Sequence, residues 1–470
     1  MNFWDAASSL PTFPLIALAV ALLVAFAFEF INGFHDTANA VTTVIYTRSL
    51  PPTWAVLYSG FLNFLGVLLG GTAVAFGIVN LLPVDLLVDS RTGAALVMVL
   101  SLLLAGVTWN LGTWYLGLPV SSSHTLIGSI VGVGVANSLW NGDYKFKSVN
   151  LDKLVETGLA LLVSPVLGFV GAAVILLGMK AVFRSPKLYT PPVGDDRPPW
   201  WIRTVLIGTC GGVSFAHGEN DGQKGMGLLM LVLIGFMPLH YALNVKTPDL
   251  APKVLTAAAA VRAAFAKADK PVPEKLDAEL KHLENRLANV TSFNDTEHLP
   301  LDKDIRWEVR QNCLLAAKEL KKLEADVSLP EDTRKALKAA RTAAITPAVE
   351  FIPLWAIVGT ALALGVGTTV GYKRIVVTVA EKIGKQHLTY AQGAAAELMA
   401  TITIFGFARL GLPVSTTHIL NSAVAGTMVA NGTGVQGATV RKILLAWVCT
   451  LPACMLLAGG FFFVGRLIFG

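Results

Sequence analysis

The chain has 470 residues, of which 54% are hydrophobic and only 14% are charged, and its formal net charge is +6. An ordinary soluble domain carries about 25% charged residues, so this composition excludes a typical soluble protein and indicates a polytopic membrane protein in a lipid bilayer. The positive charge does not indicate a nucleic-acid partner. Lys and Arg occur in short loops such as 184–187 and 373–374, which is the distribution that orients helices in a membrane.

Apolar runs long enough to cross a bilayer follow one another along the chain. The first, from Phe13 to Phe28, is preceded by no Lys or Arg and followed by no small-residue cleavage site, so we interpret it as a transmembrane helix and not as a signal peptide. About ten crossings are predicted. The remaining runs lie near 54–80, 94–117, 155–183, 201–217, 225–245, 350–371, 388–410 and 440–468.

One segment departs from this pattern. Beyond Lys246 and before Thr346 the chain holds 33 of its 68 charged residues. Runs of Ala, Leu, Glu and Lys with helical period, and acidic residues directly after Pro330, are typical of helices and of a helix N-terminus. We predict a soluble insert, formed by a charged helical hairpin or a small bundle.

Two motifs occur twice, which is the strongest signal in the sequence. The stretch 32-NGFHDTANA-40 pairs with 217-HGENDGQKG-225, and 117-GLPVSSSHTLIGSIVG-132 pairs with 411-GLPVSTTHILNSAVAG-426. Asp36 and Ser121 are 85 residues apart, whereas Asp221 and Ser415 are 194 apart, and the excess of 109 is close to the length of the insert. The chain is therefore a duplicated unit whose second copy is interrupted.

The duplication predicts the order of domains. The expected parts are a first membrane repeat over 1–183, a connecting loop over 184–200, the start of a second repeat over 201–245, the charged insert over 246–346 and the remainder of the second repeat over 347–470. Both motifs bring Gly, Pro and polar residues into apolar runs, so each is expected to interrupt a helix. Such paired interruptions point to a transporter site near the bilayer midplane.

The Gly-Leu-Pro-Val-Ser elements have the chemistry of helix starts. Pro119 favours a first helical position, and the hydroxyls at 121–123 are good N-caps. A helix N-terminus offers free N–H groups and a positive dipole end, so two of them facing each other, at 121–123 and 415–417, suit a small tetrahedral oxyanion. The alternative is that these hydroxyls only bond back to helix carbonyls.

The Asp-bearing motifs indicate a cation. A carboxylate in the membrane is costly unless it is paired, and Asp36 and Asp221 could hold Na⁺ or carry H⁺. An anion cannot enter such a region without compensating positive charge, so cation coupling follows from electrostatics. Lys224 either attracts the anion or forms an ion pair with Asp221, three residues before it.

Four further polar residues have two interpretations each. His124 and His418 occupy equivalent positions in the two copies, where they either relay protons or hydrogen-bond each hairpin to a neighbouring helix. Glu29 and Glu397 each lie in an apolar helix, where an interhelical hydrogen bond is the alternative to a functional role.

Together, the four motifs in this order resemble the inorganic phosphate transporter (Pit) family, and most of all its bacterial low-affinity members. The resemblance covers nearly all of both membrane halves and does not need the insert. It implies an all-α polytopic membrane protein with two inverted repeats, each holding a broken helix and a re-entrant helical hairpin. It also implies a homodimer in the inner (plasma) membrane that imports inorganic phosphate with H⁺ or Na⁺, either as the free anion or as a complex with a divalent metal.

Carried over by position, the resemblance implies two sets of site residues and no cofactor. His35 and Glu219 depart from the family pattern, which leaves the identity and number of the coupling ions open. No metal site is expected beyond that of a transported cation. The phosphate site falls on Ser121, Ser122, Ser123, Ser415, Thr416, Thr417, Gln223 and Lys224, and the cation site on Asp36, Asn39, Asn220 and Asp221.

Two other functions stay open. Sulfate or another tetrahedral oxyanion is the alternative substrate, since the family contains sulfate carriers. Hydrogen phosphate donates a hydrogen bond, so a nearby acceptor such as Asp36 favours it over sulfate. An intramembrane hydrolase built on Ser122 and His124 is the alternative from another class. Catalysis needs one nucleophile with one oriented base, whereas the two copies are symmetric, so we expect no enzyme.

Overall fold

The computed structural model describes residues 3–8, 10–81, 94–144, 149–192, 197–247, 249–295, 297–299, 302–371, 376 and 383–469. Within these ranges all regular secondary structure is helical, apart from one isolated bridge between Gly384 and Val435. This confirms the all-α prediction. The chain divides into two compact units, one formed by Met1–Leu15 and Leu233–Ile352, the other by Ile16–Val232 and Pro353–Gly470.

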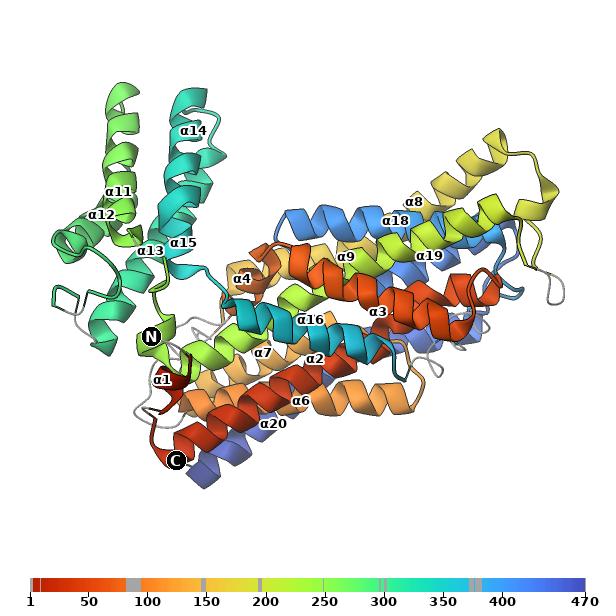
Figure 1. Cartoon of the computed structure of the whole chain (residues 1–470), viewed down its shortest axis with the longest axis horizontal. Coiled ribbons are helices and arrows are strands. Elements are labelled where there is room, and N and C mark those ends of the chain that lie inside the picture. Colours follow the sequence, from red (N-terminus) through yellow and green to blue (C-terminus); the bar gives the residue numbers. More distant parts are fainter. Residues whose placement is uncertain are drawn as a thin grey trace. The chain divides into compact units, whose positions relative to one another are not determined.

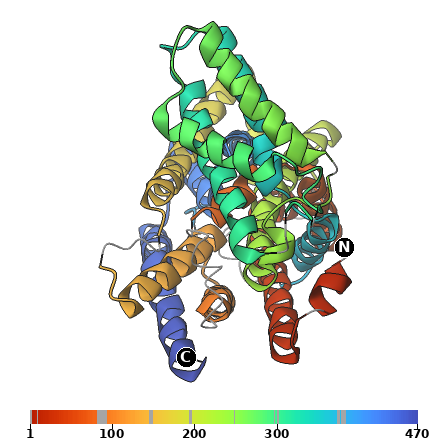
Figure 2. The same ribbon diagram turned by 90° about the vertical axis from the view of Figure 1, so that its left-hand side faces the viewer.

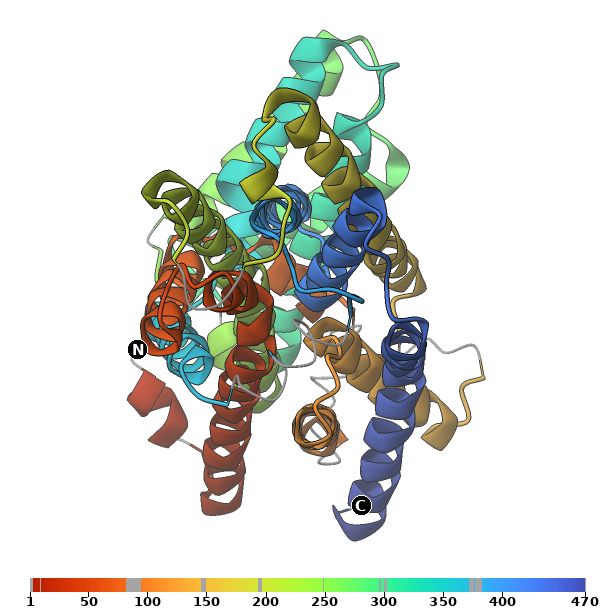
Figure 3. The same cartoon turned by 90° about the vertical axis from the view of Figure 1, so that its right-hand side faces the viewer.

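The larger unit consists of long helices, several of which run far along the bundle (Figure 1). Its helices pack in pairs, and Figure 3 shows α8 beside the blue helices α18 and α19, which it contacts. The helices that lie wholly or mostly in this unit are α2 (Thr12–Tyr46), α3 (Pro52–Leu69), α4 (Ala73–Val79), α6 (Ala94–Tyr115), α7 (Ser122–Trp140), α8 (Leu151–Val182), the short 3₁₀ turn Pro186–Leu188, α9 (Trp200–Phe236), α16 (Leu354–Thr368), α18 (Tyr390–Arg409), α19 (Thr416–Asn431) and α20 (Gly437–Phe469).

The two sequence copies interlock in this unit. The second hairpin helix of the first copy, α7, packs against α20 of the second copy, and α19 of the second copy packs in the same way against α8 of the first. The helices α3 and α16, which follow the two Asp-bearing helices, pack against each other. These reciprocal pairs are what a twofold relation between the copies produces.

Each Gly-Leu-Pro-Val-Ser element forms the turn of a helical hairpin, α6 to α7 in the first copy and α18 to α19 in the second. Gly117 and Gly411 have φ values of 66° and 71°, in the left-handed region that favours glycine. The next N–H, of Leu118 or Leu412, bonds to the carbonyl five residues before it, at 3.0 Å in both copies. Both hairpins therefore end their first helix with the same Schellman motif.

The prediction that the Asp-bearing motifs break their helices is wrong. Both motifs lie inside continuous helices, α2 and α9, of 35 and 37 residues. A helix tolerates an interior glycine at a cost of about 1 kcal/mol, and here the glycines serve packing. A Cβ on Gly33 would clash with the carbonyl oxygen of Leu364 in α16, and one on Gly218 would clash with that of Asn63 in α3.

The larger unit has the surface expected of a multi-pass membrane protein. Large apolar side chains such as Leu162, Val448 and Leu456 are at least 70% exposed, while many polar residues are buried. Among the described residues, six helices are long and apolar enough to cross a membrane, or seven if one bent pair counts as a single span. The runs 201–217 and 225–245, predicted as separate crossings, belong largely to the single helix α9.

The smaller unit has the opposite distribution, with an apolar core and a charged surface. It contains the charged segment that was predicted over 246–346, and α14 begins directly after Pro330, as the sequence indicated. Figure 2 shows the long helices of this unit side by side, in green and teal. Its helices are α1 (Phe3–Ser8), α10 (Pro238–Tyr241), α11 (Leu250–Lys267), α12 (Glu274–Leu287), α13 (Lys303–Glu324), α14 (Glu331–Ala340), the π-helical turn Arg341–Ile345 and α15 (Thr346–Val349).

A buried arginine joins the two ends of the charged segment. The Nη1 atom of Arg310 in α13 donates to the carbonyl oxygens of Ala242 at 2.7 Å and Val349 at 3.0 Å. The entering and leaving chains also bond directly, from the N–H of Asn244 to the carbonyl of Ala348 at 2.9 Å. Burial lowers the pKa of Arg310 to about 10, so the side chain is still charged at neutral pH and its hydrogen bonds are charge-assisted.

We predict that Arg310→Ala destabilises the smaller unit. The substitution leaves two buried carbonyl groups without their donor, at a cost of roughly 1–3 kcal/mol each. Limited proteolysis of the purified protein should then cut faster within 250–345. Lys335→Ala is the control, because it breaks only an exposed ion pair with Glu331, which is worth at most about 1 kcal/mol. Equal protection in both variants would contradict the role of Arg310.

Candidate functional site

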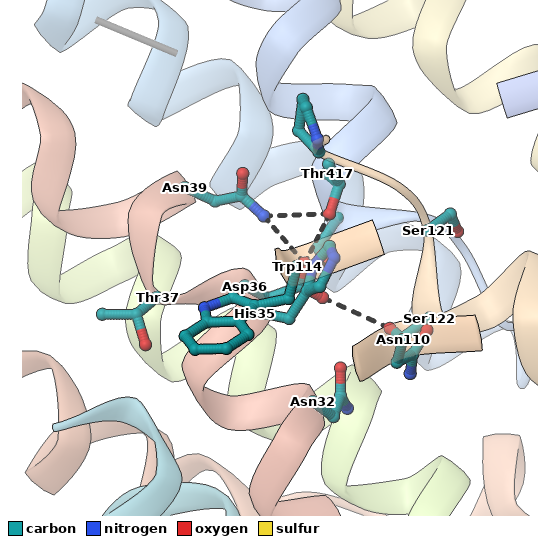
Figure 4. Close-up of polar contacts among 12 residues, drawn as sticks. Asn32, His35, Asp36, Thr37, Asn39, Asn110, Trp114, Ser121, Ser122 and Thr417 are labelled. Carbon is teal, nitrogen blue, oxygen red and sulfur yellow. Dashed lines mark hydrogen bonds and ion pairs between the residues drawn. The ribbon is translucent and has the colours of Figure 1, made fainter. Parts of the chain in front are cut away.

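A buried cluster of polar residues forms where the two hairpin turns meet α2 and α9, and Asp36 is its centre. Thr417 Oγ1 donates to Asp36 Oδ1 at 2.6 Å, and Ser122 Oγ donates to Asp36 Oδ2 at 3.2 Å. Thr416 Oγ1 lies 3.4 Å from the same Oδ2 atom. Asn39, one turn along α2, donates to both Asp36 and Thr417 (Figure 4). Hydroxyls from both copies thus converge on one carboxylate.

Asp221 and Lys224 form the second half of the cluster. Lys224 Nζ lies 2.7 Å from Asp221 Oδ1, which confirms the ion-pair interpretation of this lysine. The same ammonium donates to Ser123 Oγ at 2.5 Å and to the carbonyl of Val414 at 2.9 Å. Ser122 Oγ also lies 3.3 Å from Asp221 Oδ2. Lys224 therefore joins both hairpin turns to α9.

His217 lies between the two carboxylates. Its Nε2 atom is 3.6 Å from Asp36 Oδ2 and 3.5 Å from Asp221 Oδ2, and its Nδ1 atom is 2.7 Å from the side-chain oxygen of Asn63. Asp36, His217 and Asp221 each offer a ligand atom within 4.8 Å of the others. Two carboxylate oxygens and an imidazole nitrogen at this spacing could hold a cation.

The hydroxyl residues divide into two groups. Ser121 and Ser415 are the N-caps of α7 and α19, where their side chains accept from the N–H groups of His124 and His418. Ser122, Thr416 and Thr417 instead face the carboxylates, and Ser123 Oγ donates to the carbonyl of Val414 at 2.6 Å. The predicted cap therefore uses one residue of each triplet and leaves the others for the cluster.

The two equivalent histidines contact each other. The ring centroids of His124 and His418 are 4.5 Å apart, and His418 stacks on Trp447 at 3.8 Å. Trp447 in turn donates from its indole N–H to the carbonyl of Pro119 at 3.0 Å. This stack joins the two hairpins beside the cluster through ring contacts. It differs from the predicted hydrogen bonds to a neighbouring helix, because His124 Nδ1 lies 2.9 Å from Ser121 Oγ in its own turn and His418 Nε2 has no hydrogen-bond partner among the described residues.

Three residues singled out in the sequence, Gln223, Asn220 and Glu219, make none of the cluster's hydrogen bonds described above. The side-chain oxygen of Gln223, predicted at the phosphate, accepts from the N–H of Val74 at 2.8 Å, and among the described residues no hydrogen bond joins it to the cluster. Asn220 is fully buried, and neither atom of its side-chain amide has a partner among those residues. Glu219 is 3.7 Å from the exposed Arg409.

The two buried glutamates have different surroundings. Glu397 accepts a hydrogen bond from Thr209 of α9 at 2.6 Å, so the predicted interhelical hydrogen bond is present. Glu29 has no such bond among the described residues. Of the two interpretations, the interhelical hydrogen bond therefore describes Glu397, whereas it does not describe Glu29.

The sequence analysis missed His217 and Asn32 as members of the cluster. Asn32 lies 3.4 Å from Asp221 Oδ2, and His217 contacts both carboxylates. The paired motifs start at these two residues, each four positions before its aspartate. The signal was the alignment of the repeats itself, because residues at i and i+4 share one face of a helix.

Comparisons with known proteins match this chain to phosphate transporters. Residues 32–458 match the model of the phosphate transporter family. The chain is 40% identical to the low-affinity inorganic phosphate transporters PitB and PitA of Escherichia coli (strain K12), with 96% of each chain covered. It is 39% identical to the low-affinity inorganic phosphate transporter of Buchnera aphidicola subsp. Acyrthosiphon pisum (strain APS), over 95% of this chain and 96% of that one.

A solved structure has the same fold. The sodium-dependent phosphate transporter superposes with a TM-score of 0.55 at 21% identity, covering 96% of this chain and 100% of that one. The matched family and relatives are transporters, which confirms that an enzyme is not expected here. From the duplicated motifs, the interlocked helices and these matches, the chain belongs to the phosphate transporter family.

Proposed function

We propose that this protein imports inorganic phosphate together with a cation, and that the cluster around Asp36, Asp221 and Lys224 is the transport site. One observation carries the proposal, namely that hydroxyls from both hairpin turns and one lysine converge on a buried pair of carboxylates. The low-affinity phosphate transporters that resemble this chain support inorganic phosphate as the substrate.

The phosphate site is proposed at the starts of α7 and α19. Ser122, Ser123, Thr416 and Thr417 supply hydroxyl donors, and the N-terminal N–H groups of both helices supply a positive dipole end. Lys224 supplies the only full positive charge that bonds to these turns among the described residues. A phosphate oxygen accepts the same hydrogen bonds that the carboxylates accept in this structure, so the anion would take over donors that are already aimed at one point.

The coupling cation is proposed at Asp36 and Asp221, with Asn39 and Asn220 as neutral oxygen ligands. A phosphate beside two carboxylates would bring like charges together at low dielectric, so the anion needs a cation to offset the repulsion. Na⁺ or H⁺ serves this purpose. The ligand atoms of Asp36, His217 and Asp221 would equally suit a divalent metal carried as a complex with phosphate.

Phosphate is favoured over sulfate by the acceptors in the cluster. Hydrogen phosphate can donate its remaining proton to a carboxylate or to the carbonyl of Val414, whereas sulfate has no proton to donate and would leave that acceptor facing an anion. Sulfate or another tetrahedral oxyanion remains the alternative substrate on the same fold.

The larger architecture is proposed to follow the family pattern. Two inverted repeats would place the hairpins as re-entrant elements that meet near the bilayer midplane. The reciprocal pairs of α7 with α20 and α19 with α8 support a twofold relation between the copies. We further propose that the protein lies in the inner (plasma) membrane as a homodimer.

Uptake of radiolabelled phosphate into proteoliposomes tests the proposal. The wild-type protein should concentrate phosphate under an imposed pH or Na⁺ gradient, and excess sulfate should compete weakly. Asp36→Asn and Asp221→Asn should each abolish gradient-driven uptake in a protein that still folds, because the cation loses its charged ligand. Wild-type rates in both variants, or no uptake by the wild type, would refute the proposed mechanism.

The hydroxyl residues give a second prediction, which separates anion binding from helix capping. Replacing Ser122, Ser123, Thr416 or Thr417 by Ala should remove a charge-assisted hydrogen bond worth roughly 1.5–3 kcal/mol. Phosphate affinity should fall about ten- to hundredfold. Ser121→Ala and Ser415→Ala are the matched controls, because loss of a cap should reduce stability by about 1 kcal/mol with little change in affinity.

Two measurements on each purified variant decide between these roles. The dissociation constant of phosphate reports binding, and the midpoint of thermal unfolding reports capping. If affinity is intact in all four variants of the first group, the hydroxyls only hold the hairpins together and the anion binds elsewhere.

The third prediction concerns the charged segment, which we propose has a structural or regulatory role. All the residues of the cluster lie in the larger unit, and the chain enters and leaves the segment at adjacent positions, where Asn244 bonds to Ala348. Replacing 250–345 by a short Gly/Ser bridge should therefore change the phosphate dissociation constant by less than about threefold, which corresponds to under ~0.7 kcal/mol. Loss of binding in a folded deletion variant would show that the segment takes part in substrate binding.

A further inference from the structure

A buried glutamate with no assigned role lies beside the cluster. Glu29 is on α2, seven residues before Asp36, and its exposure is 0%. Neither of its carboxylate oxygens makes a hydrogen bond of good geometry with the described residues, and the side chain that interacts with it from its own helix is the amide of Asn32, one turn along α2. An ionised carboxylate in such a place would be neither solvated nor paired, so it is tolerated there chiefly as the neutral acid.

The chain makes room for this carboxyl group on the facing helix. A Cβ on Gly225 of α9 would clash with the Cδ, Cγ and Oε1 atoms of Glu29. Gly225 directly follows Lys224, so the carboxyl group lies against α9 at the level of the Lys224–Asp221 ion pair. Any larger residue at 225 would force the glutamate away from the cluster.

Glu29 also lies in line with residues of the cluster. At positions i, i+3 and i+7, Glu29, Asn32 and Asp36 share one face of α2. On α9 the spacing of His217, Asp221 and Lys224 is similar, and Asn32 joins the two rows through its contact with Asp221. The carboxyl group is thus one helical turn from a residue that bonds to the transport site.

The Asn32 amide acts on Glu29 from α2 itself, and the charged groups that act on Glu29 most strongly come from α9. They are Asp221, Lys224 and His217. Two other helices near this part of α2 are α6, where Gly106 meets Phe28, and α16, where Gly367 meets Phe30, while α7, which carries His124, approaches the same point through Thr125. Neither α6 nor α16 contains an acidic, basic or histidine residue. The protonation of Glu29 therefore depends on the state of the transport site.

The pseudo-symmetry of the chain shows that packing does not require this glutamate. The spacing that relates Asp36 to Asp221 relates Glu29 to Ser214. Ser214 is satisfied by ordinary bonds, since its hydroxyl contacts Cys210 and Ser59 at 2.8 Å each. The second copy thus fills the same position with a small neutral residue, whereas the first copy keeps an unpaired acid.

We propose that Glu29 is the residue that binds and releases the transported proton, an inference that rests on the proposed function and specifies H⁺ as a coupling ion. The negative charge of bound phosphate strengthens proton binding by Glu29, whose carboxyl group takes a proton from water. When phosphate leaves, this charge is lost and proton binding weakens, so the proton returns to water on the other side of the membrane. One proton then moves with each phosphate.

This scheme makes phosphate and proton binding mutually favourable, because a coupling between two sites is reciprocal. In the wild type, phosphate affinity should rise as the pH falls, beyond the change due to the titration of phosphate itself. In Glu29→Gln, which mimics the neutral acid, this additional pH dependence should disappear. Because the titration of phosphate is the same for both proteins, the difference between their affinity profiles isolates the contribution of Glu29.

Transport in proteoliposomes gives the second measurement. A pH difference of one unit should let the wild type concentrate phosphate about tenfold, the factor per decade of proton activity for one coupled proton. Glu29→Gln should still exchange phosphate for phosphate but accumulate none. Glu397→Gln is the matched control, because it removes another buried carboxylate, which bonds to Thr209 and, among the described residues, to no member of the cluster, and it should accumulate phosphate as the wild type does.

Several outcomes would overturn the proposal. Proton-driven accumulation by Glu29→Gln at the wild-type level would exclude Glu29 as the proton carrier. If Glu29→Gln loses both phosphate exchange and phosphate accumulation, Glu29 has a role in structure or substrate binding, and the proposal is also wrong. Glu29→Asp keeps a carboxyl group and should still accumulate phosphate. If it behaves as Glu29→Gln does, the size of the side chain matters and not its proton. A wild type driven only by Na⁺ refutes this inference alone, whereas a wild type without any phosphate uptake refutes the proposed function.

Discussion

The burial of two carboxylates, Asp36 and Asp221, is the constraint on which the rest of the larger unit depends. A carboxylate inside an apolar bundle is costly unless donors and opposite charge surround it. Here the compensation comes from four helices at once: α2 and α9 supply amides, His217 and Lys224, and the starts of α7 and α19 supply hydroxyls. No single helix could satisfy either carboxylate, so the cluster also fixes how these helices are placed.

The duplication explains how one chain brings these four helices together. The hairpin of each copy rests against the final helix of the other copy, through the pairs α7 with α20 and α8 with α19. The Asp-bearing helices cross over in the same way, because Gly33 and Gly218 let them approach α16 and α3 closely. The site therefore lies at the contact between the copies.

The hydrogen-bond donors around the two carboxylates explain why the proposed transport site suits an anion. Its donors are aimed in advance at acidic oxygens, and a phosphate oxygen is an acceptor of the same kind, so binding needs little reorganisation. What the anion lacks is positive charge, since Lys224 is already paired with Asp221. The proposed coupling to a cation would offset this shortage, and the proposed proton site at Glu29, beside the ion pair, would be one place to supply it.

The sequence by itself determined the membrane class, the duplication and most members of the cluster, because composition, repeated motifs and N-cap hydroxyls are local signals. It could not show that α2 and α9 run unbroken, since whether a glycine ends a helix or admits a neighbour depends on what packs against it. It also placed Gln223 at the phosphate, whereas this residue bonds to the start of α4. Only the tertiary structure decided that His217 joins both carboxylates and that Glu29 has no hydrogen-bond partner on another helix among the described residues, because these properties arise from contacts between helices distant in the chain.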